Sequence, residues 1–365
     1  VRGAETDMLT PEAVQRLHRR IIGSRISLIE DAGHAVPTDQ PAALAQHIRV
    51  GRVQHAYLFT GASAIGKHTL AVAFARALLC EEENAPCAEP NQCRSCTLIL
   101  AAKHPDVRML APVISGKIIN TAKIGIEPIR ELIRQFSLRP METERRVAII
   151  TDFEAAGHAA ADALLKTLEE PPGNSIIILT AESAADLPPT IVSRCARMAL
   201  RPLQRAVVQS ALSELWGCAP EQAELLARLS GGRLGWAVDL RSDESALEAR
   251  AQRLSELRTL LPAARVERFA YADELRKDRS ALVATLDLWG CWWRDVMHVA
   301  AGASTALTNA DRSADIRFAA DQLTAADAAR AVASVRAAQA RLERNANARL
   351  ALEVLLLDLP HISIA

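Results

Sequence analysis

The chain has 365 residues, half of them hydrophobic, and its 43 lysines and arginines are balanced by 43 aspartates and glutamates. This length predicts two or three domains, and the zero net charge argues against a protein that grips nucleic acid alone, since such proteins usually carry a basic excess. No apolar run approaches the roughly 20 residues of a membrane-spanning helix. We therefore expect a cytoplasmic protein with no membrane partner.

Between residues 54 and 200, short apolar runs alternate with segments of helical periodicity. Four runs have the length and composition of buried strands: 55–60, 107–111, 146–151 and 175–180. Three segments between them have apolar residues at helical spacing: 67–80, 127–137 and 155–170. Because continuous apolar strands joined by helices need cover on both faces, this order predicts an α/β domain with a parallel sheet over residues 50–202.

The pattern changes after Pro202, where helical periodicity continues almost unbroken to Leu359. Glycines interrupt it near residues 217, 231–232 and 302. We expect a small helical lid domain over residues 203–242 and an all-α domain over residues 243–365.

Residues 61–69, GASAIGKHT, stand between a predicted strand and a predicted helix and match the phosphate-loop pattern G-x-x-x-x-G-K. Gly61 and Gly66 allow backbone N–H groups to curl around phosphate oxygens, and Lys67 would reach the outer phosphates. The next residue should be a Ser or Thr that binds Mg²⁺, but it is His68. Thr69 comes one position late, about 100° around the helix. A chance glycine-rich turn is the alternative interpretation.

The second acidic motif of such a site would end the strand 146–151 with Asp-Glu, for Mg²⁺ and for the attacking water. This chain has Thr151 and Asp152 at those positions, so a hydroxyl replaces the metal carboxylate and a shorter acid takes the place of the base. Two independent losses in one site predict that ATP is not hydrolysed, whereas ATP binding stays open.

Four cysteines fall within seventeen residues: Cys80, Cys87, Cys93 and Cys96. The last two form a C-x₂-C pair, and four thiolates suit tetrahedral Zn²⁺. Because clustered cysteines in a cytosolic chain of this size point to metal more than to disulfides, we expect a zinc-binding insertion over residues 80–96. Buried or redox-active thiols are the alternative.

Four segments together carry a family resemblance: HAYLFTGASAIGKHTLAVAFARALLC (55–80) with HPDV (104–107), DALLKTLEEPP (162–172), LPPTIVSRC (187–195) and NANARLALEVLLLDLP (345–360). Over residues 50–365 the chain resembles the AAA+ subunits of bacterial clamp loaders, and among them the delta-prime family of DNA polymerase III. The resemblance implies a P-loop AAA+ domain, a lid and a C-terminal collar that oligomerises. It also implies a hetero-pentameric ring with gamma/tau and delta subunits, which loads a sliding clamp onto primed DNA during replication.

In such rings each ATP site lies between two subunits, and one neighbour supplies an arginine in trans. Carried onto this chain, that residue is Arg194, in the triplet Ser193-Arg194-Cys195. A guanidinium stabilises the charge on the transferring phosphate. Delta-prime proteins typically supply it without hydrolysing ATP, so the resemblance implies a chain that is not catalytic alone. The alternative is a structural arginine that pairs with Glu169 or Glu170.

Three features depart from the family pattern. His68 breaks the phosphate loop, and Trp236 stands near the place of a second sensor arginine in active subunits. The spacing from Cys87 to Cys93 exceeds the usual C-x₂-C-x₂-C by three residues, which leaves Cys87 open as a ligand. Intact Mg²⁺ ligands would instead favour an active gamma/tau-like ATPase, which is the alternative function.

Residues 1–49 do not resemble this family. The segments 1–9 and 27–48 resemble the last strands and helix of an α/β-hydrolase, in which Asp7 and His34 would be the acid and base of a triad. The chain lacks the nucleophile motif G-x-S-x-G, so we expect no activity from such a remnant. A fused or chimeric segment is the interpretation, and RRIIGSRISL (19–28) leaves a family-like opening as the alternative.

Overall fold

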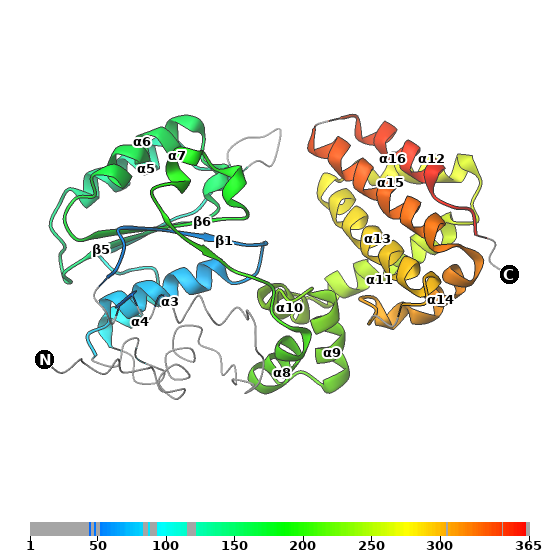
Figure 1. Cartoon of the computed structure of the whole chain (residues 1–365), viewed down its shortest axis with the longest axis horizontal. Coiled ribbons are helices and arrows are strands. Elements are labelled where there is room, and N and C mark those ends of the chain that lie inside the picture. The colour runs from blue at the N-terminus through cyan, green and yellow to red at the C-terminus, as the bar shows by residue number, and fades with distance from the viewer. Residues whose placement is uncertain are drawn as a thin grey trace, which may run out of the picture. The chain divides into compact units, whose positions relative to one another are not determined.

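The computed structural model describes these residues: Leu44, 47–48, 52–82, Cys87, 93–114, 122–303, 306–344 and 346–362. The chain divides into two compact units (Figure 1). The first runs to Cys218 and takes in Gly232–Trp236. The second comprises Ala219–Gly231 and Ala237–Ala365. The predicted lid segment therefore contributes residues to both units.

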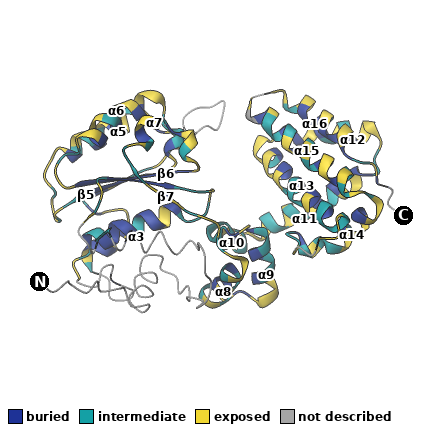
Figure 2. Cartoon of the chain, viewed as in Figure 1, coloured by how far each residue is buried: buried dark blue, intermediate teal, exposed yellow. Residues whose placement is uncertain are grey.

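The first unit is built on a parallel sheet with the strand order β2-β5-β6-β1-β7. Its strands are β1 (Ala56–Thr60), β2 (Val107–Leu110), β5 (Arg146–Ile150), β6 (Ser175–Ala181) and β7 (Ala196–Ala199). A separate antiparallel pair consists of β3 (Val113–Ile114) and β4 (Ala122–Lys123). Strands β5 and β6 are buried along their whole length, as a sheet covered on both faces requires (Figure 2). The predicted parallel α/β domain is confirmed.

The edge strand β7 is absent from the four predicted strands. Its sequence, Ala-Arg-Met-Ala, contains no apolar run, and only Met198 of the four is buried. It pairs with β1 through Tyr57 to Thr60, and Leu200 beyond it donates its N–H to Thr60 O at 2.7 Å. Because β7 begins two residues after Arg194, it fixes that arginine at the edge of the sheet.

Helices cover both faces of the sheet (Figure 1). One face carries α3 (Lys67–Leu79) and α4 (Arg94–Leu100), and the other carries α5 (Ile126–Phe136), α6 (His158–Glu169) and α7 (Pro189–Val192). Two short 3₁₀ turns are η1 (Phe153–Ala155) and η2 (Ala184–Asp186). Strand β1 shows the division, because successive side chains point to opposite faces. Tyr57 and Phe59 pack with Phe74 of α3, whereas Ala56 and Leu58 join the core under α5 and α6.

Helices make up the chain after β7. Three span the predicted lid segment: α8 (Arg205–Trp216), α9 (Pro220–Leu229) and α10 (Leu234–Arg241). The rest are α11 (Glu244–Leu260), α12 (Arg265–Leu275), α13 (Arg279–Ala300), η3 (Ala310–Arg312), α14 (Ser313–Gln322), α15 (Ala325–Glu343) and α16 (Ala348–Asp358). Trp289 and Trp293 of α13 are fully buried in their common core, which confirms the all-α C-terminal region. None of these described helices is long and apolar enough to cross a bilayer.

Most of the predicted hydrolase-like segment, with Asp7 and His34, lies outside the described residues. Its end, however, packs on the sheet domain. Leu44 is fully buried in the same core as Tyr57, and His47 Nδ1 lies 3.1 Å from the Tyr57 hydroxyl. We therefore begin the sheet domain at or before Leu44 instead of at residue 50.

Replacing Leu44 with alanine should lower the free energy of unfolding by about 3 kcal/mol, since a fully buried leucine leaves a cavity behind. Leu138→Ala is the matched control, because that side chain is 62% exposed and its loss should cost less than about 0.5 kcal/mol. Urea unfolding followed by circular dichroism measures both. Equal stabilities for the two variants would show that this segment does not belong to the domain core.

Candidate functional sites

The phosphate loop lies where the sequence predicts it, between the end of β1 and the start of α3. Both of its pattern glycines have left-handed backbone angles, with φ 150° at Gly61 and 103° at Gly66. A Cβ on Gly61 would also come within 2.8 Å of the Leu200 carbonyl oxygen. Only glycine meets both demands at Gly61, so the tight turn is built into the sequence.

Lys67 is the basic residue of this loop, and it is buried, with 7% of its surface exposed. Its Nζ donates to Gly61 O at 2.6 Å and to Ala62 O at 3.2 Å. The ammonium is therefore held by carbonyls of the loop that it would serve. His68 and Thr69 are exposed on the next positions of α3. A phosphate bound at this loop would compete with these carbonyls for the lysine.

The start of α10 lies against the same loop, which sequence reasoning missed. A Cβ on Gly235 would come within 2.7 Å of Ala64 O, so only glycine permits this approach. Ala64 itself has the left-handed φ of 56°, an uncommon value for a residue with a side chain. The signal in the sequence was a glycine inside a helical segment, which often marks a close approach of backbones.

The acidic motif follows β5 directly. Thr151 donates both its N–H, at 2.9 Å, and its hydroxyl, at 3.3 Å, to Leu110 O of β2. Asp152 has φ 48°, and its N–H donates to the Thr180 hydroxyl at 3.0 Å. Thr180 is a buried polar residue near the end of β6 that the sequence analysis did not single out. The Thr151 hydroxyl thus binds the backbone of the edge strand β2. ATP hydrolysis would need a metal-binding carboxylate at this position.

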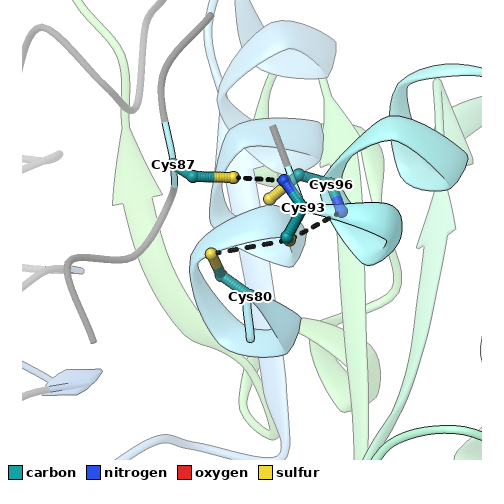
Figure 3. A group of neighbouring side chains, drawn as sticks. All are labelled: Cys80, Cys87, Cys93 and Cys96. Atoms are coloured by element: carbon teal, nitrogen blue, oxygen red, sulfur yellow. Dashed lines mark hydrogen bonds between the residues drawn. The ribbon is translucent and has the colours of Figure 1, made fainter. Parts of the chain in front are cut away.

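The four clustered cysteines come together in space (Figure 3). Their sulfurs all lie within 4.8 Å of one another, and the Sγ atoms of Cys80 and Cys93 are 3.9 Å apart. Tetrahedral zinc with Zn–S bonds of 2.3 Å would separate its sulfurs by about 3.8 Å. Cys87 belongs to the group, so the longer spacing before Cys93 is compatible with a four-sulfur site. The cluster can hold a metal ion.

Local hydrogen bonds aim two of these sulfurs. The N–H of Cys93 donates to Cys87 Sγ at 3.1 Å, and the N–H of Cys96 donates to Cys93 Sγ at 3.4 Å. Burial raises the pKa of the Cys80 and Cys96 thiols. Four thiolates this close would repel one another without a cation, whereas a divalent metal binds thiolates and keeps them deprotonated. The donor set therefore fits a thiolate-binding metal such as zinc.

Arg194 stands between α7 and β7, with a third of its side chain exposed. Its Nη1 donates to Thr190 O at 2.8 Å, and its Nη2 lies 2.5 Å from Glu169 Oε1 at the end of α6. The structural pairing with Glu169 is thus present. A surface ion pair of this kind contributes only ~0–1 kcal/mol, so a more highly charged partner can displace it.

The two neighbours of Arg194 have partners within the chain. The Ser193 hydroxyl accepts from Arg194 Nη1 at 3.5 Å. The hydroxyl of Ser193 donates back to Thr190 O at 3.2 Å. The thiol of Cys195 packs against the core beneath α7, where burial raises its pKa to about 12. A thiol with that pKa stays protonated and inert at neutral pH. Within the triplet, the guanidinium of Arg194 is the group available for chemistry outside the chain.

Comparison with known proteins supplies the family. A family model described as "DNA polymerase III, delta subunit" matches residues 38–204, and one described as "DNA polymerase III, delta subunit, C terminal" matches residues 244–361. The delta-prime subunit of DNA polymerase III from Bacillus subtilis is 30% identical over 317 residues, which are 86% of this chain and 92% of that protein. The chain belongs to the DNA polymerase III delta-prime family.

Other proteins are similar to parts of the chain. The delta-prime subunit of Pseudomonas aeruginosa is 34% identical over 67% of this chain and 72% of its own length. The tau subunit of Bacillus subtilis is 30% identical over 58% of this chain and 35% of its own length. Among solved structures, a gamma-subunit-related protein of DNA polymerase III from Thermotoga maritima has a TM-score of 0.41 and 17% identity, over 86% of this chain and 97% of that one.

Family membership confirms the predicted role as a clamp-loader subunit. The first family match also begins at residue 38, within the segment that resembled a hydrolase. This start agrees with the burial of Leu44 in the core of the delta-prime sheet domain.

Proposed function

We propose that this delta-prime protein works in a clamp-loader ring by supplying Arg194 to an ATP site of a neighbouring subunit. The observation that carries the proposal is the environment of the Arg194 guanidinium, which lies at the edge of the sheet and is partly exposed. It donates to the Thr190 carbonyl, the Ser193 hydroxyl and the Glu169 carboxylate. Such an arginine can reach a phosphate on another chain at small cost.

The ring partners in this proposal are gamma/tau and delta subunits in a hetero-pentamer. The assembly acts in the cytoplasm, where it opens a sliding clamp and loads it onto primed DNA. Contacts with DNA belong to the assembly, because the chain itself has no net charge. Tau relatives that match more than half of this chain support the choice of gamma/tau as neighbours.

The chain's own nucleotide site is degenerate in this proposal. Gly61, Gly66 and Lys67 can cradle a phosphate. Thr69, however, comes one position too late to be the Mg²⁺ ligand, and Asp152 is a shorter acid at the position of the base. The involvement of the Thr151 hydroxyl with β2 supports the same conclusion. The loop can still bind ATP, but the bound nucleotide is not hydrolysed.

The purified chain should accordingly hydrolyse ATP no faster than a buffer control, as measured by phosphate release. The matched variant is Lys67→Met, which removes the ammonium that the loop holds and keeps most of the volume. A turnover of roughly 1 s⁻¹, which is ordinary for enzymes, that disappeared in Lys67→Met would establish the alternative of a gamma/tau-like ATPase.

The cysteine cluster holds one structural Zn²⁺ in this proposal, through Cys80, Cys87, Cys93 and Cys96. Zinc would tie the end of α3 to the start of α4 and to Cys87. The support is the separation of the sulfurs, which suits tetrahedral thiolate coordination.

A further inference from the structure

A chain of hydrogen bonds leads away from the cysteine cluster. The N–H of Asp106 donates to His104 Nδ1 at 3.1 Å, and His104 Nε2 lies 3.3 Å from the Ser95 hydroxyl. The Ser95 hydroxyl donates in turn to Glu81 Oε1 at 2.7 Å. Because a backbone N–H only donates, Nδ1 must accept, so His104 is neutral and carries its proton on Nε2. Each of these hydrogen bonds is therefore donated in the same direction, from Asp106 toward Glu81.

One end of this series of hydrogen bonds lies beside the cysteines. Ser95 lies between Cys93 and Cys96 in α4 and is 3% exposed, while Glu81 directly follows Cys80. The Ser95 N–H also donates to Glu81 Oε1 at 3.2 Å. These two bonds join the segments that carry three of the four sulfurs.

The fourth cysteine is held separately. Arg76 of α3, itself buried, donates from Nη2 to the carbonyl oxygen of Cys87 at 2.9 Å. The polar groups around the cluster thus position its ligands as outer partners of a metal site usually do.

The other end of this series of hydrogen bonds, at Asp106, holds a surface loop. The buried carboxylate of Asp106 accepts from the N–H groups of Met141, Glu142 and Thr143 at 2.7, 2.8 and 3.0 Å. The side chain of Met141 is 75% exposed, so it adds no core packing to this loop. The Asp106 carboxylate therefore binds the backbone of all three residues of this loop, and the Thr143 hydroxyl also donates to it at 3.1 Å.

We propose that His104, Ser95 and Asp106 form a brace through which metal binding at the four cysteines orders the surface loop 141–143. This inference rests on the metal site proposed above. Asp106 carries both connections, since its N–H faces His104 and its carboxylate faces the loop. A second, weaker link joins Arg94, next to Cys93, to Glu142 at 3.0 Å. Coupling of this kind is reciprocal. If metal binding favours the ordered loop by a given factor, loss of the brace lowers the metal affinity by the same factor.

The test follows amide hydrogen exchange of residues 141–143 and zinc affinity, by chelator competition, in the full chain. Removing zinc from the wild type should speed exchange of these amides about 10-fold, and Ser95→Ala, which deletes only a hydroxyl, should weaken zinc binding by about 10-fold. His104→Ala should do the same, and His104→Gln should recover part of the loss because its amide can still donate to Ser95. Lys103→Ala is the control on an exposed neighbour, and it should change neither quantity.

Unchanged exchange at residues 141–143 after zinc removal would overturn the brace, as would wild-type zinc affinity in both Ser95→Ala and His104→Ala. If the wild-type chain holds no metal, the metal proposal fails first. The link from Ser95 to the loop is then tested by Ser95→Ala alone. Unchanged amide exchange of residues 141–143 in that variant would contradict this link as well.

Discussion

Arg194→Ala should leave the delta-prime chain folded and assembled but lower ATP hydrolysis by a reconstituted clamp loader. The γ-phosphate leaves with negative charge spread over its oxygens, and a guanidinium from a neighbouring subunit neutralises it. A trans arginine can be worth ~10³-fold at its own site, and the remaining sites of the ring would mask part of this loss. Arg194→Lys should recover little, because lysine lacks the planar fork of donors.

The stability of the chain should hardly change, since Arg194 takes part in one exposed ion pair worth ~0–1 kcal/mol. Glu169→Gln is the matched control, because it removes the same ion pair and keeps the guanidinium. The steady-state ATPase of complexes with normal stoichiometry distinguishes the roles. An equal ATPase loss in both variants would make the pair structural, and an unchanged ATPase in Arg194→Ala would end the assignment of a trans arginine.

Loss of one cluster cysteine should abolish zinc binding. Purified in reductant, the wild-type chain should contain one zinc, and Cys93→Ser should lose it on dialysis against a chelator. Structural zinc sites of four ligands contribute about 10–16 kcal/mol of apparent binding free energy in isolated fingers, so one missing thiolate weakens the site severely. Cys87→Ser should behave like Cys93→Ser, because its sulfur lies within the same group.

Cys218→Ser is the control for this experiment, since that buried thiol is not a member of the cluster. Elemental analysis of the four proteins gives the answer. A wild-type chain without zinc would contradict the metal site. Zinc retained in Cys87→Ser and lost in Cys93→Ser would contradict the role of Cys87 alone.

The sheet was largely predictable because its central strands are continuous apolar runs. Strands β5 and β6 are buried on both faces, and such strands leave a strong signal in the sequence. Strand β7 leaves none, because an edge strand with one buried residue looks like a loop. The burial of Leu44 was also out of reach, since a hydrolase-like pattern in the surrounding residues masked its contact with the sheet.

The candidate sites were also predictable only in part. The phosphate loop and the C-x₂-C pair are short motifs, so their residues could be named from spacing. Spacing alone left Cys87 open, and only the distances between sulfurs bring it into the group. The brace from Ser95 to Asp106 and on to residues 141–143 joins segments far apart in the chain. Hydrogen bonds of that kind depend on the folded backbone and leave no periodic pattern.

The central claim is that this delta-prime protein acts through the arginine it supplies and not through its own phosphate loop. The most direct measurement is the rate of clamp loading onto primed DNA by reconstituted complexes that carry Lys67→Met or Arg194→Ala. We predict loading near the wild-type rate with Lys67→Met and much slower loading with Arg194→Ala. Slow loading with Lys67→Met together with a normal rate for Arg194→Ala would contradict the account.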